Sequence, residues 1–294
     1  MKMRVIQGCR GEFPIDVMCS VFGVSKSGFY EWKRRQRSPS PKQRRREKLK
    51  RTIEVVHLGS RQNIGSPRLQ GVTAGMGFKE SPRTVARIMK SLGIRSRTKK
   101  KFRKTTDSDH KLPVAPNHLM QDFRAYRPNQ IWMSDLTYVR TQQGWLYVCA
   151  IIDLYSRRIV GWAASSRMTV DLILLAYMRA CIFRQPGRGL IFHSDRGCQY
   201  ASQAFKKALK KRGHIQSMSR RANCWDSAPI ESFWRTLKVE HVYWENYRTR
   251  EQAMLSIQAW IEGDYNLHRP HSSLGNLSPR VFEKKGVAMQ TRKD

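Results

Sequence analysis

The chain has 294 residues, 40% hydrophobic and 10% aromatic, which is enough apolar material for a sizeable globular core and excludes a disordered chain. Its formal net charge is +34, so a polyanionic partner is expected, nucleic acid first and an anionic membrane surface second. The sequence has no run of about 18 apolar residues, no apolar N-terminal signal segment and no CxxC pair among its six cysteines, so we expect a reduced, cytoplasmic protein without a membrane span.

Residues 1–37 are predicted to form a helix-turn-helix unit. Gly23 can supply a left-handed turn residue, and Ser25 is a good N-cap for the second helix. That helix is expected to enter a DNA major groove with Ser25 and Lys26 leading. The alternative is a small helical hairpin that binds protein or caps the fold. The faces expected to be buried contain Val17, Met18, Val21 and Phe22 in the first helix and Phe29, Tyr30 and Trp32 in the second.

Residues 38–98 are predicted to form a second helical, helix-turn-helix-like DNA-binding unit. A basic run opens it and suits contacts with phosphate that carry no sequence preference, although it also suits a solvated segment. Ser66 precedes a proline at a helix start, and Gly93 ends a third helix over residues 81–92. Arg83 and Arg87 lie off the apolar face of that helix and are the candidates for DNA contact. The apolar face contains Val85, Ile88, Met89 and Leu92.

Residues 99–128 are predicted to be a basic, proline-containing linker, and residues 129–245 a catalytic core. In the core, apolar and alternating runs indicate three strands in a meander, then a helix, a strand, a helix, a strand and a last helix. This order is that of an α/β, ribonuclease-H-like fold with a mixed five-stranded sheet and flanking helices. Leu172, Leu175, Ala176 and Ile182 are expected to be core residues of the first helix. Residues 246–294 are predicted to be a C-terminal helix and tail that pack on the core, with Arg269 and His271 as DNA or subunit contacts.

Three acidic residues stand at unusual places in this core. Asp135 lies inside an apolar strand, Asp195 ends another, and Glu231 lies on an amphipathic helix. A buried acid is costly unless it is paired or binds a metal. If the fourth strand lies beside the first, Asp135 and Asp195 become neighbours at one sheet edge and the last helix brings Glu231 over them. We expect them to hold two Mg²⁺ ions, which Mn²⁺ can replace, for an in-line phosphoryl transfer.

Other polar residues of the core have more than one interpretation. Arg235 and Lys238 share a helix face with Glu231 and are expected to contact DNA phosphate, with a solvated helix face as the alternative. His193 is an auxiliary candidate for which a structural or substrate-contact role is favoured over that of a general base. Asp226, in a turn, is an auxiliary metal-ligand candidate. The rival acids Asp153 and Asp171 are assigned to pairing with Arg157 or Arg158 and to a helix N-terminus.

Five motifs occur together between residues 129 and 275. They are residues 129–138 (NQIWMSDLTY), 152–162 (IDLYSRRIVGW), 193–200 (HSDRGCQY), 223–234 (NCWDSAPIESFW) and 268–275 (HRPHSSLG). In combination they resemble the orfB-type bacterial insertion-sequence transposases, DDE enzymes of the retroviral-integrase superfamily. The departures are small: Cys198 stands where that family usually has Ser, Ser227 where Asn is usual, and Ile64 where a Tyr precedes Gly. None of them is an acidic position.

The resemblance implies a DNA transposase. Its helical units would bind the terminal inverted repeats of the element, and the core would hydrolyse a phosphodiester and use the freed 3′-hydroxyl to attack a second one in target DNA. Asp135 and Asp195 would bridge the two ions and Glu231 would hold one. The resemblance also implies a homo-oligomer on DNA, a nucleoid-associated location, and fusion with or binding to an orfA-type protein from an upstream reading frame.

Two other functions remain open from the sequence. The chain can be a catalytically silent DNA-binding regulator of the element, which the intact acidic triad argues against. It can also be a ribonuclease of the same fold, which would have no need for the paired helix-turn-helix signals.

Overall fold

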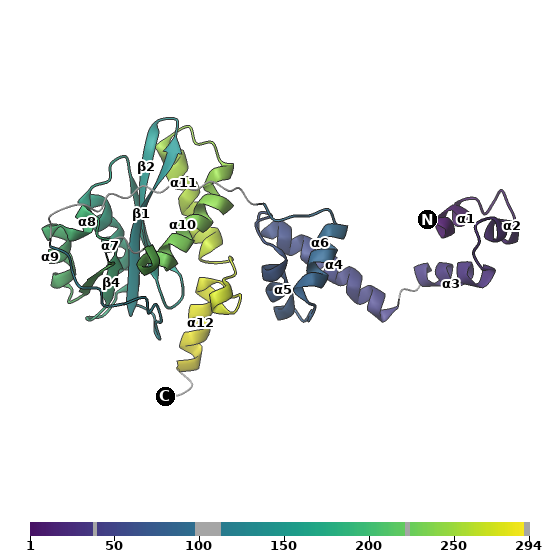
Figure 1. Ribbon diagram of the computed structural model, residues 1–294, viewed down its shortest axis with the longest axis horizontal. Coiled ribbons are helices and arrows are strands. Elements are labelled where there is room, and N and C mark those ends of the chain that lie inside the picture. Colours follow the sequence, from purple (N-terminus) through teal and green to yellow (C-terminus); the bar gives the residue numbers. More distant parts are fainter. Residues whose placement is uncertain (38–39, 98–112, 221–223, 291–294) are drawn as a thin grey trace.

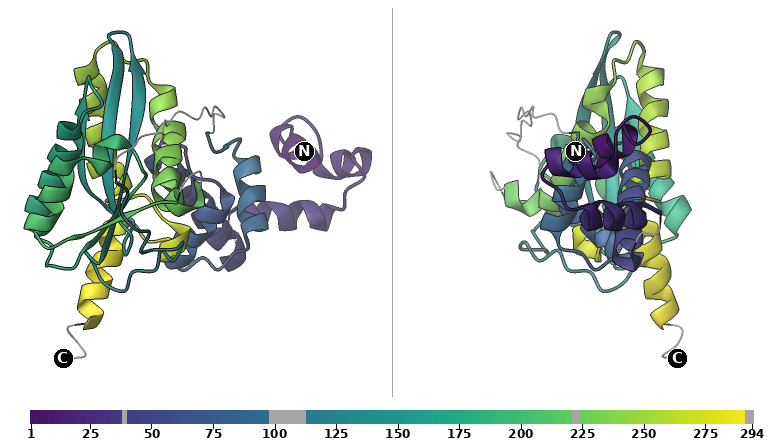
Figure 2. Two further views of the ribbon diagram at one scale, coloured as in Figure 1. Left: turned by 60° about the vertical axis from the view of Figure 1, so that its left-hand side comes forward. Right: turned by 90° about the vertical axis from the view of Figure 1, so that its right-hand side faces the viewer.

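The computed structural model describes the chain except for residues 38–39, 98–112, 221–223 and 291–294. Two helical units precede a unit built on a sheet, and the first helical unit stands apart from the rest, which it reaches through α3 and α4 (Figures 1 and 2). The helices of the first unit are α1 (Lys2–Gly8), α2 (Ile15–Val21) and α3 (Lys26–Arg37), and those of the second are α4 (Pro41–Gly59), α5 (Ser66–Gly75) and α6 (Pro82–Ser91).

The first helical unit has the predicted turn but not the predicted apolar face. Gly23 has φ +60°, and Ser25 Oγ accepts a hydrogen bond from the Gly28 N–H at 3.1 Å, as expected for an N-cap. Val17 and Val21 are exposed, so their predicted burial is wrong, and the same holds for Tyr30. The sequence analysis missed α1, whose Ile6 packs with the buried residues of α2 and α3. The small core contains Ile6, Met18, Cys19 and Phe29.

The second helical unit matches its predicted helix ends. Ser40 and Ser81 cap α4 and α6, each accepting a hydrogen bond from the backbone N–H three residues on at 3.2 Å. Gly93 follows α6 with φ +68°. The apolar face of α6 is buried as predicted, with Leu92 partly buried. The core contains Leu49, Ile53, Ile64, Leu69, Phe78, Val85, Ile88 and Met89.

The third unit contains the predicted mixed five-stranded sheet, in the order β3-β2-β1-β4-β5. β1 to β3 form an antiparallel meander, and β4 and β5 are added parallel to β1. The fourth strand therefore lies beside the first, as the placement of the acids required. The strands are β1 (Ile131–Thr141), β2 (Gly144–Asp153), β3 (Ile159–Ser165), β4 (Ile191–Ser194) and β5 (Ile215–Met218).

Helices cover both faces of this sheet (Figure 1). One apolar cluster joins the sheet to α7 (Val170–Arg184), α8 (Cys198–Ala201) and α9 (Gln203–Lys211). The other joins it to α10 (Ala228–Glu240), α11 (Arg250–Ala259) and a π-helical turn over Trp260–Tyr265. The predicted core of α7 is partly wrong, because Leu175 and Ile182 are 39% and 70% exposed. This helix is apolar on nearly every side, and the sheet takes the face with Ile173, Tyr177 and Cys181.

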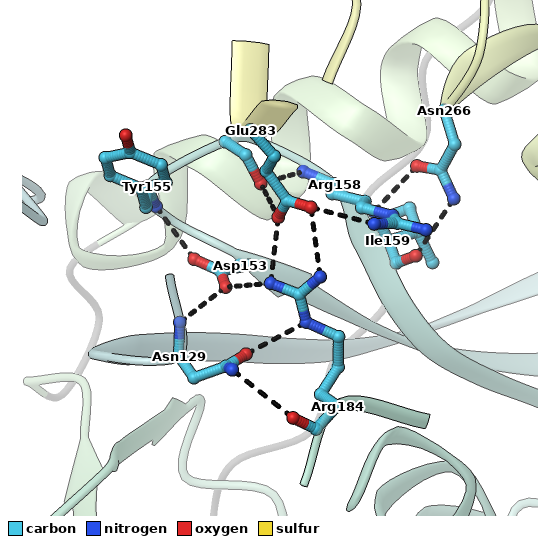
Figure 3. A network of polar contacts seen from close by, with 9 residues as sticks. Asn129, Asp153, Tyr155, Arg158, Ile159, Arg184, Asn266 and Glu283 are labelled. Carbon is cyan, nitrogen blue, oxygen red and sulfur yellow. Dashed lines mark hydrogen bonds and ion pairs between the residues drawn. The ribbon is translucent and has the colours of Figure 1, made fainter. Parts of the chain in front are cut away.

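The C-terminal helix α12 (Pro279–Gln290) is anchored by a buried ionic network (Figure 3). Glu283 accepts hydrogen bonds from Ser156 Oγ, Arg158 Nη1 and both terminal nitrogens of Arg184 at 2.7 to 3.0 Å. Asp153 pairs with an arginine, as predicted, but the partner is Arg184 at 3.4 Å and not an arginine of the segment that follows it. Arg184 ends α7 and reaches both acids, which no local sequence pattern indicates.

Short 3₁₀ turns connect these elements, at Cys224–Ser227, Val242–Trp244 and Ser272–Leu274. Across the described ranges, no helix combines the length and the apolar composition needed to cross a membrane.

Candidate active site

The strand register places Asp135 beside Asp195. Ser134 on β1 is paired with Ser194, the last residue of β4, and each acid is the next residue along its chain. Because the two strands are parallel, both chains run in the same direction at this point and present their acids at the same end of the sheet. Asp195 Oδ1 accepts a hydrogen bond from the Gly197 N–H at 2.9 Å, which turns the chain out of the strand and fixes the carboxylate.

Glu231 lies in the first turn of α10, the helix that crosses this part of β1. Trp234, one turn further on, donates a hydrogen bond from Nε1 to Asp135 Oδ2 at 3.0 Å. Its ring is buried next to Phe233 and Leu237, which hold α10 on the apolar face of the sheet. The indole therefore links the helix with Glu231 directly to the strand with Asp135. The sequence analysis missed this role, although a Trp one turn after Glu231 on the inward side is a usable signal.

The electrostatics indicate that the three carboxyl groups act on one another. Burial, followed by the charges of Asp195 and Glu231, raises the pKa of Asp135 to about 8, against the opposing hydrogen bonds from the Leu136 N–H and the Trp234 indole. Asp135 is thus an acid whose strongest charged neighbours are two other acids.

A hard divalent cation fits this set of donors. The three groups offer only carboxylate oxygens, which Mg²⁺ and Mn²⁺ prefer, and the excess negative charge around Asp135 is what such a cation would relieve. Among the residues that the structure describes, no three His, Cys, Asp or Glu side chains lie close enough to form a complete ligand set. The acids are electrostatic neighbours and not a closed cage.

Two basic residues of α10 flank this site. Lys238 is half-buried, with Nζ 5.1 Å from the centroid of the Tyr138 ring. Burial lowers its pKa, and the nearby charge of Asp135 opposes that shift, which places Lys238 near the acids. Arg235 is exposed on the same side of the helix as Glu231.

His193 and Asp226 lie in bonded structural positions. His193 is fully buried, its Nδ1 is 2.8 Å from Ser217 Oγ on β5, and burial lowers its pKa to about 4, so the ring is neutral at pH 7. Asp226 pairs with Arg220 at 2.8 Å and accepts a hydrogen bond from Asn117 Nδ2 at 2.9 Å. The Arg220 guanidinium lowers the pKa of Asp226 to about 2. Both residues hold together the elements beside the site.

The predicted DNA-contacting residues of the helical units are exposed and belong to other parts of the molecule. Arg83 and Arg87 lie on the outer side of α6. Ser25 caps α3, and Lys26 forms an exposed ion pair with Asp16 at 2.8 Å. The fold therefore brings Asp135, Asp195, Glu231 and Lys238 together and leaves these four residues in the separate helical units (Figure 1).

Comparisons with known families and proteins agree with this architecture. Two family models described as an integrase core domain match residues 125–224 and 212–279, and an HTH-like domain matches residues 43–102. The chain is 46% identical to the insertion element IS600 uncharacterized 31 kDa protein of Shigella sonnei, over 91% of this chain and 98% of that one. It is 39% identical to transposase InsF for insertion sequence IS3A of Escherichia coli (strain K12), over 98% of this chain and all of that one.

A solved structure, the catalytic core domain of BIV integrase, covers 55% of this chain and 99% of its own, with 15% identity and a TM-score of 0.43. That likeness is too low to carry an argument, and the family assignment depends on the two full-length relatives. An integrase core domain together with an HTH-like domain makes this chain a DNA-binding enzyme. As its motifs predict, the chain belongs to the orfB-type bacterial insertion-sequence transposases of the retroviral-integrase superfamily.

Proposed function

We propose that this transposase cuts and joins DNA at the ends of its insertion sequence by metal-dependent phosphoryl transfer at Asp135, Asp195 and Glu231. The observation that carries the proposal is the electrostatic influence of Asp195, at the end of β4, and Glu231, on α10, on Asp135 of β1, whose pKa is raised to about 8 by burial and by these two charges. A stable fold avoids such an arrangement unless a cation is to occupy it.

In this proposal Asp135, Asp195 and Glu231 would hold two Mg²⁺ ions, which Mn²⁺ could replace. Bound there, the ions would supply a nucleophile of lowered pKa and would neutralise the charge of the transferring phosphoryl group. The chain itself orients the ligands: the Trp234 indole fixes Asp135, and the Gly197 N–H fixes Asp195. Metal ligands that are held in this way need little reorganisation when substrate arrives.

The chemistry has two balanced steps. In the first, the oxygen of a water molecule bonds to phosphorus at the element's end, the P–O3′ bond breaks, and the 3′-hydroxyl leaves with a proton. In the second, that hydroxyl attacks a phosphodiester of target DNA, its proton is released, and one target strand leaves with its own 3′-hydroxyl. Lys238 and Arg235, on the same side of α10 as Glu231, are placed to contact the phosphates that flank the reacting one.

The rest of the molecule supplies the substrate. A net charge of +34 favours binding to double-stranded DNA, because DNA releases its condensed counterions when a basic protein neutralises its phosphates. We assign recognition of the terminal inverted repeats to α3, led by Ser25 and Lys26, and to α6, through Arg83 and Arg87. Joining two element ends to a target requires more than one active site, so we further propose a homo-oligomer on DNA in the nucleoid. An orfA-type protein, fused or bound, would add a further DNA-binding unit.

Strand transfer of a labelled duplex that carries the element's terminal repeat tests this proposal. With Mg²⁺, Glu231→Gln is expected to abolish cleavage and joining while binding of the duplex persists. Glu245→Gln is the matched control, because Glu245 is an exposed acid beyond the end of α10. Joining by Glu231→Gln at the wild-type rate would refute the assignment. If the wild-type chain binds the ends but does not cleave them with any divalent metal, it is instead a silent regulator.

A further inference from the structure

The second helical unit and the catalytic unit meet at the far end of the helix that carries Glu231. Glu240, the last residue of α10, accepts hydrogen bonds from Arg269 Nε at 2.8 Å and Nη2 at 2.7 Å. Its Oε1 also pairs with Arg68 Nη1 on α5 at 3.1 Å. Its main-chain oxygen accepts a hydrogen bond from Asn63 Nδ2 at 2.8 Å. One residue of α10 thus binds two segments of the helical unit and the motif around Arg269.

Two further contacts lie around this point. Arg61 Nη2 is 2.8 Å from Asp264 Oδ2 in the π-helical turn, and the Arg97 guanidinium lies 4.2 Å from the Trp244 ring centroid. Both partners on the catalytic unit follow α10 in the chain. We call the set of contacts made by Arg61, Asn63, Arg68 and Arg97 with the catalytic unit the joint. The sequence analysis expected Arg269 to contact DNA or another subunit, but its side chain is only 11% exposed and is bonded to Glu240.

A glycine allows the two units to approach closely at the joint. A Cβ atom placed on Gly71 of α5 would lie 3.0 Å from Asn276 Cβ and closer still to the Asn276 amide group. The Asn276 Cβ position is fixed by its backbone, which has φ +62°, so rotation of the side chain does not remove the clash. Glycine within a helix is unfavourable compared with alanine. Its presence in α5 is explained by the space that Asn276 requires.

The contacts that define the joint are two ion pairs, a hydrogen bond and a cation–π contact. Residues from both units line a cavity of about 310 Å³ beside Glu240. Relative motion is the usual behaviour of two units within one chain unless their interface is large and apolar. Here Arg269, on the same unit as Glu240, binds its carboxylate bidentately and fixes its orientation. Glu240 Oε1 is thereby held where it pairs across the joint with Arg68 Nη1 at 3.1 Å.

We propose that Arg68, Glu240 and Arg269 are positioning residues, which lock the DNA-binding second unit onto the helix that carries Glu231 and so set which phosphodiester is cut. α10 is a rigid rod, and the nine helical steps from Glu231 to Glu240 span roughly 14 Å. DNA held by Arg83 and Arg87 on the outer side of α6 is thereby placed at a constant offset from the acids. This inference rests on the proposed function and adds to it the contacts that determine the cleavage position.

The test uses the full chain and the labelled terminal-repeat duplex, and it maps cleavage to the nucleotide. Gly71→Ala is expected to leave duplex binding unchanged, lower cleavage at the normal position by roughly 10²-fold, as a misplacement of about 1 Å can do, and spread cleavage over neighbouring phosphodiesters. Adding Asn276→Gly to Gly71→Ala is expected to restore both rate and position, since glycine adopts φ +62° freely. Gly75→Ala is the control, because a Cβ on Gly75 meets nothing within 4 Å.

Arg68→Met provides a second probe that does not threaten folding, because Arg68 is partly exposed at the edge of the joint. It is expected to produce the same spread of cleavage positions. Normal position and rate in both Gly71→Ala and Arg68→Met would overturn the inference, as would a Gly71→Ala defect that Asn276→Gly does not relieve. Asp135→Asn distinguishes failure of the proposed function from failure of the inference about the joint. If it remains fully active, the proposed function itself fails, whatever the joint variants do.

Discussion

Two groups of acids on one sheet have opposite electrostatic surroundings. Asp153 lies at the end of β2 and joins Glu283 in a network with Arg158 and Arg184 (Figure 3). Asp135, on the neighbouring strand, has two further acids as its strongest charged neighbours. Burial raises the pKa of both Asp135 and Asp153, but the charges of Asp195 and Glu231 raise that of Asp135 further, whereas Arg184 opposes the rise at Asp153. Against the effect of burial, the arginines lower the pKa of Glu283. A buried acid therefore does not identify a catalytic residue by its own burial; the charges around it distinguish a structural pair from a cation site.

The largest expected effect is on the structural group. Arg184→Met leaves both Asp153 and Glu283 buried without their shared guanidinium, and breaking such a pair costs about 3–5 kcal/mol of unfolding free energy. Chemical denaturation measures this loss. Arg124→Met is the control, because the Arg124–Asp122 pair is on the surface, where an ion pair contributes little to stability. Equal losses in the two variants would remove the distinction between a buried network and an ordinary surface pair.

The next effect is confined to the catalytic group. If the acids bind a divalent cation, Mg²⁺ at a hundredfold excess over its Kd raises the unfolding free energy by about 2.7 kcal/mol. Asp135→Asn is expected to lose this response, and Arg158→Met, in the other acid group, is expected to keep it. Thermal unfolding with Mg²⁺ against chelator measures both. A full response in Asp135→Asn would show that the cation binds elsewhere.

These two groups also show what the sequence could and could not predict. The adjacency of Asp135 and Asp195 could be predicted, because strand periodicity and strand order are signals that the local sequence carries. The partner of Asp153 could not, because Arg184 and Glu283 come from distant elements that only the folded sheet brings together. α7 is apolar on nearly all sides, so periodicity could not choose its buried face, and Leu175 and Ile182 were misplaced. The spacing of Trp234 from Glu231 places the indole on the inward side of α10, but its bond to Asp135 depends on how α10 crosses β1, which the spacing does not show.

A smaller effect concerns pH in the presence of chelator. The pKa of Asp135 is about 8 in the folded chain and about 3.9 in an unfolded one. The folded state therefore holds its proton more tightly, and the wild type loses stability as pH rises from about 4 to about 8. Asp135→Asn does not share this loss. Its melting temperature is expected to exceed that of the wild type at pH 9 and to equal it near pH 4, and a constant difference across this range would contradict the raised pKa.

The smallest effect separates Asp226 from the catalytic acids. Its pKa is lowered to about 2 by Arg220, so its contribution is fully present above pH about 4 and is lost as pH falls through about 2. Asp226→Asn is expected to cost about 1 kcal/mol at pH 7, the usual worth of a hydrogen bond. Strand transfer is expected to proceed in this variant, in contrast to Glu231→Gln. Complete loss of strand transfer in a folded Asp226→Asn chain would make Asp226 a fourth ligand.

The hydrogen bond from the Trp234 indole to Asp135 has an optical consequence. Indole fluorescence responds to charge near its N–H, so an ion or a phosphate that arrives at Asp135 changes the emission of Trp234 before any bond is broken. The chain has eight tryptophans, and the difference between the wild type and Trp234→Phe isolates this one signal. Occupation of the site and cleavage of DNA can therefore be timed separately in one stopped-flow trace, with Trp234 as an intrinsic fluorophore.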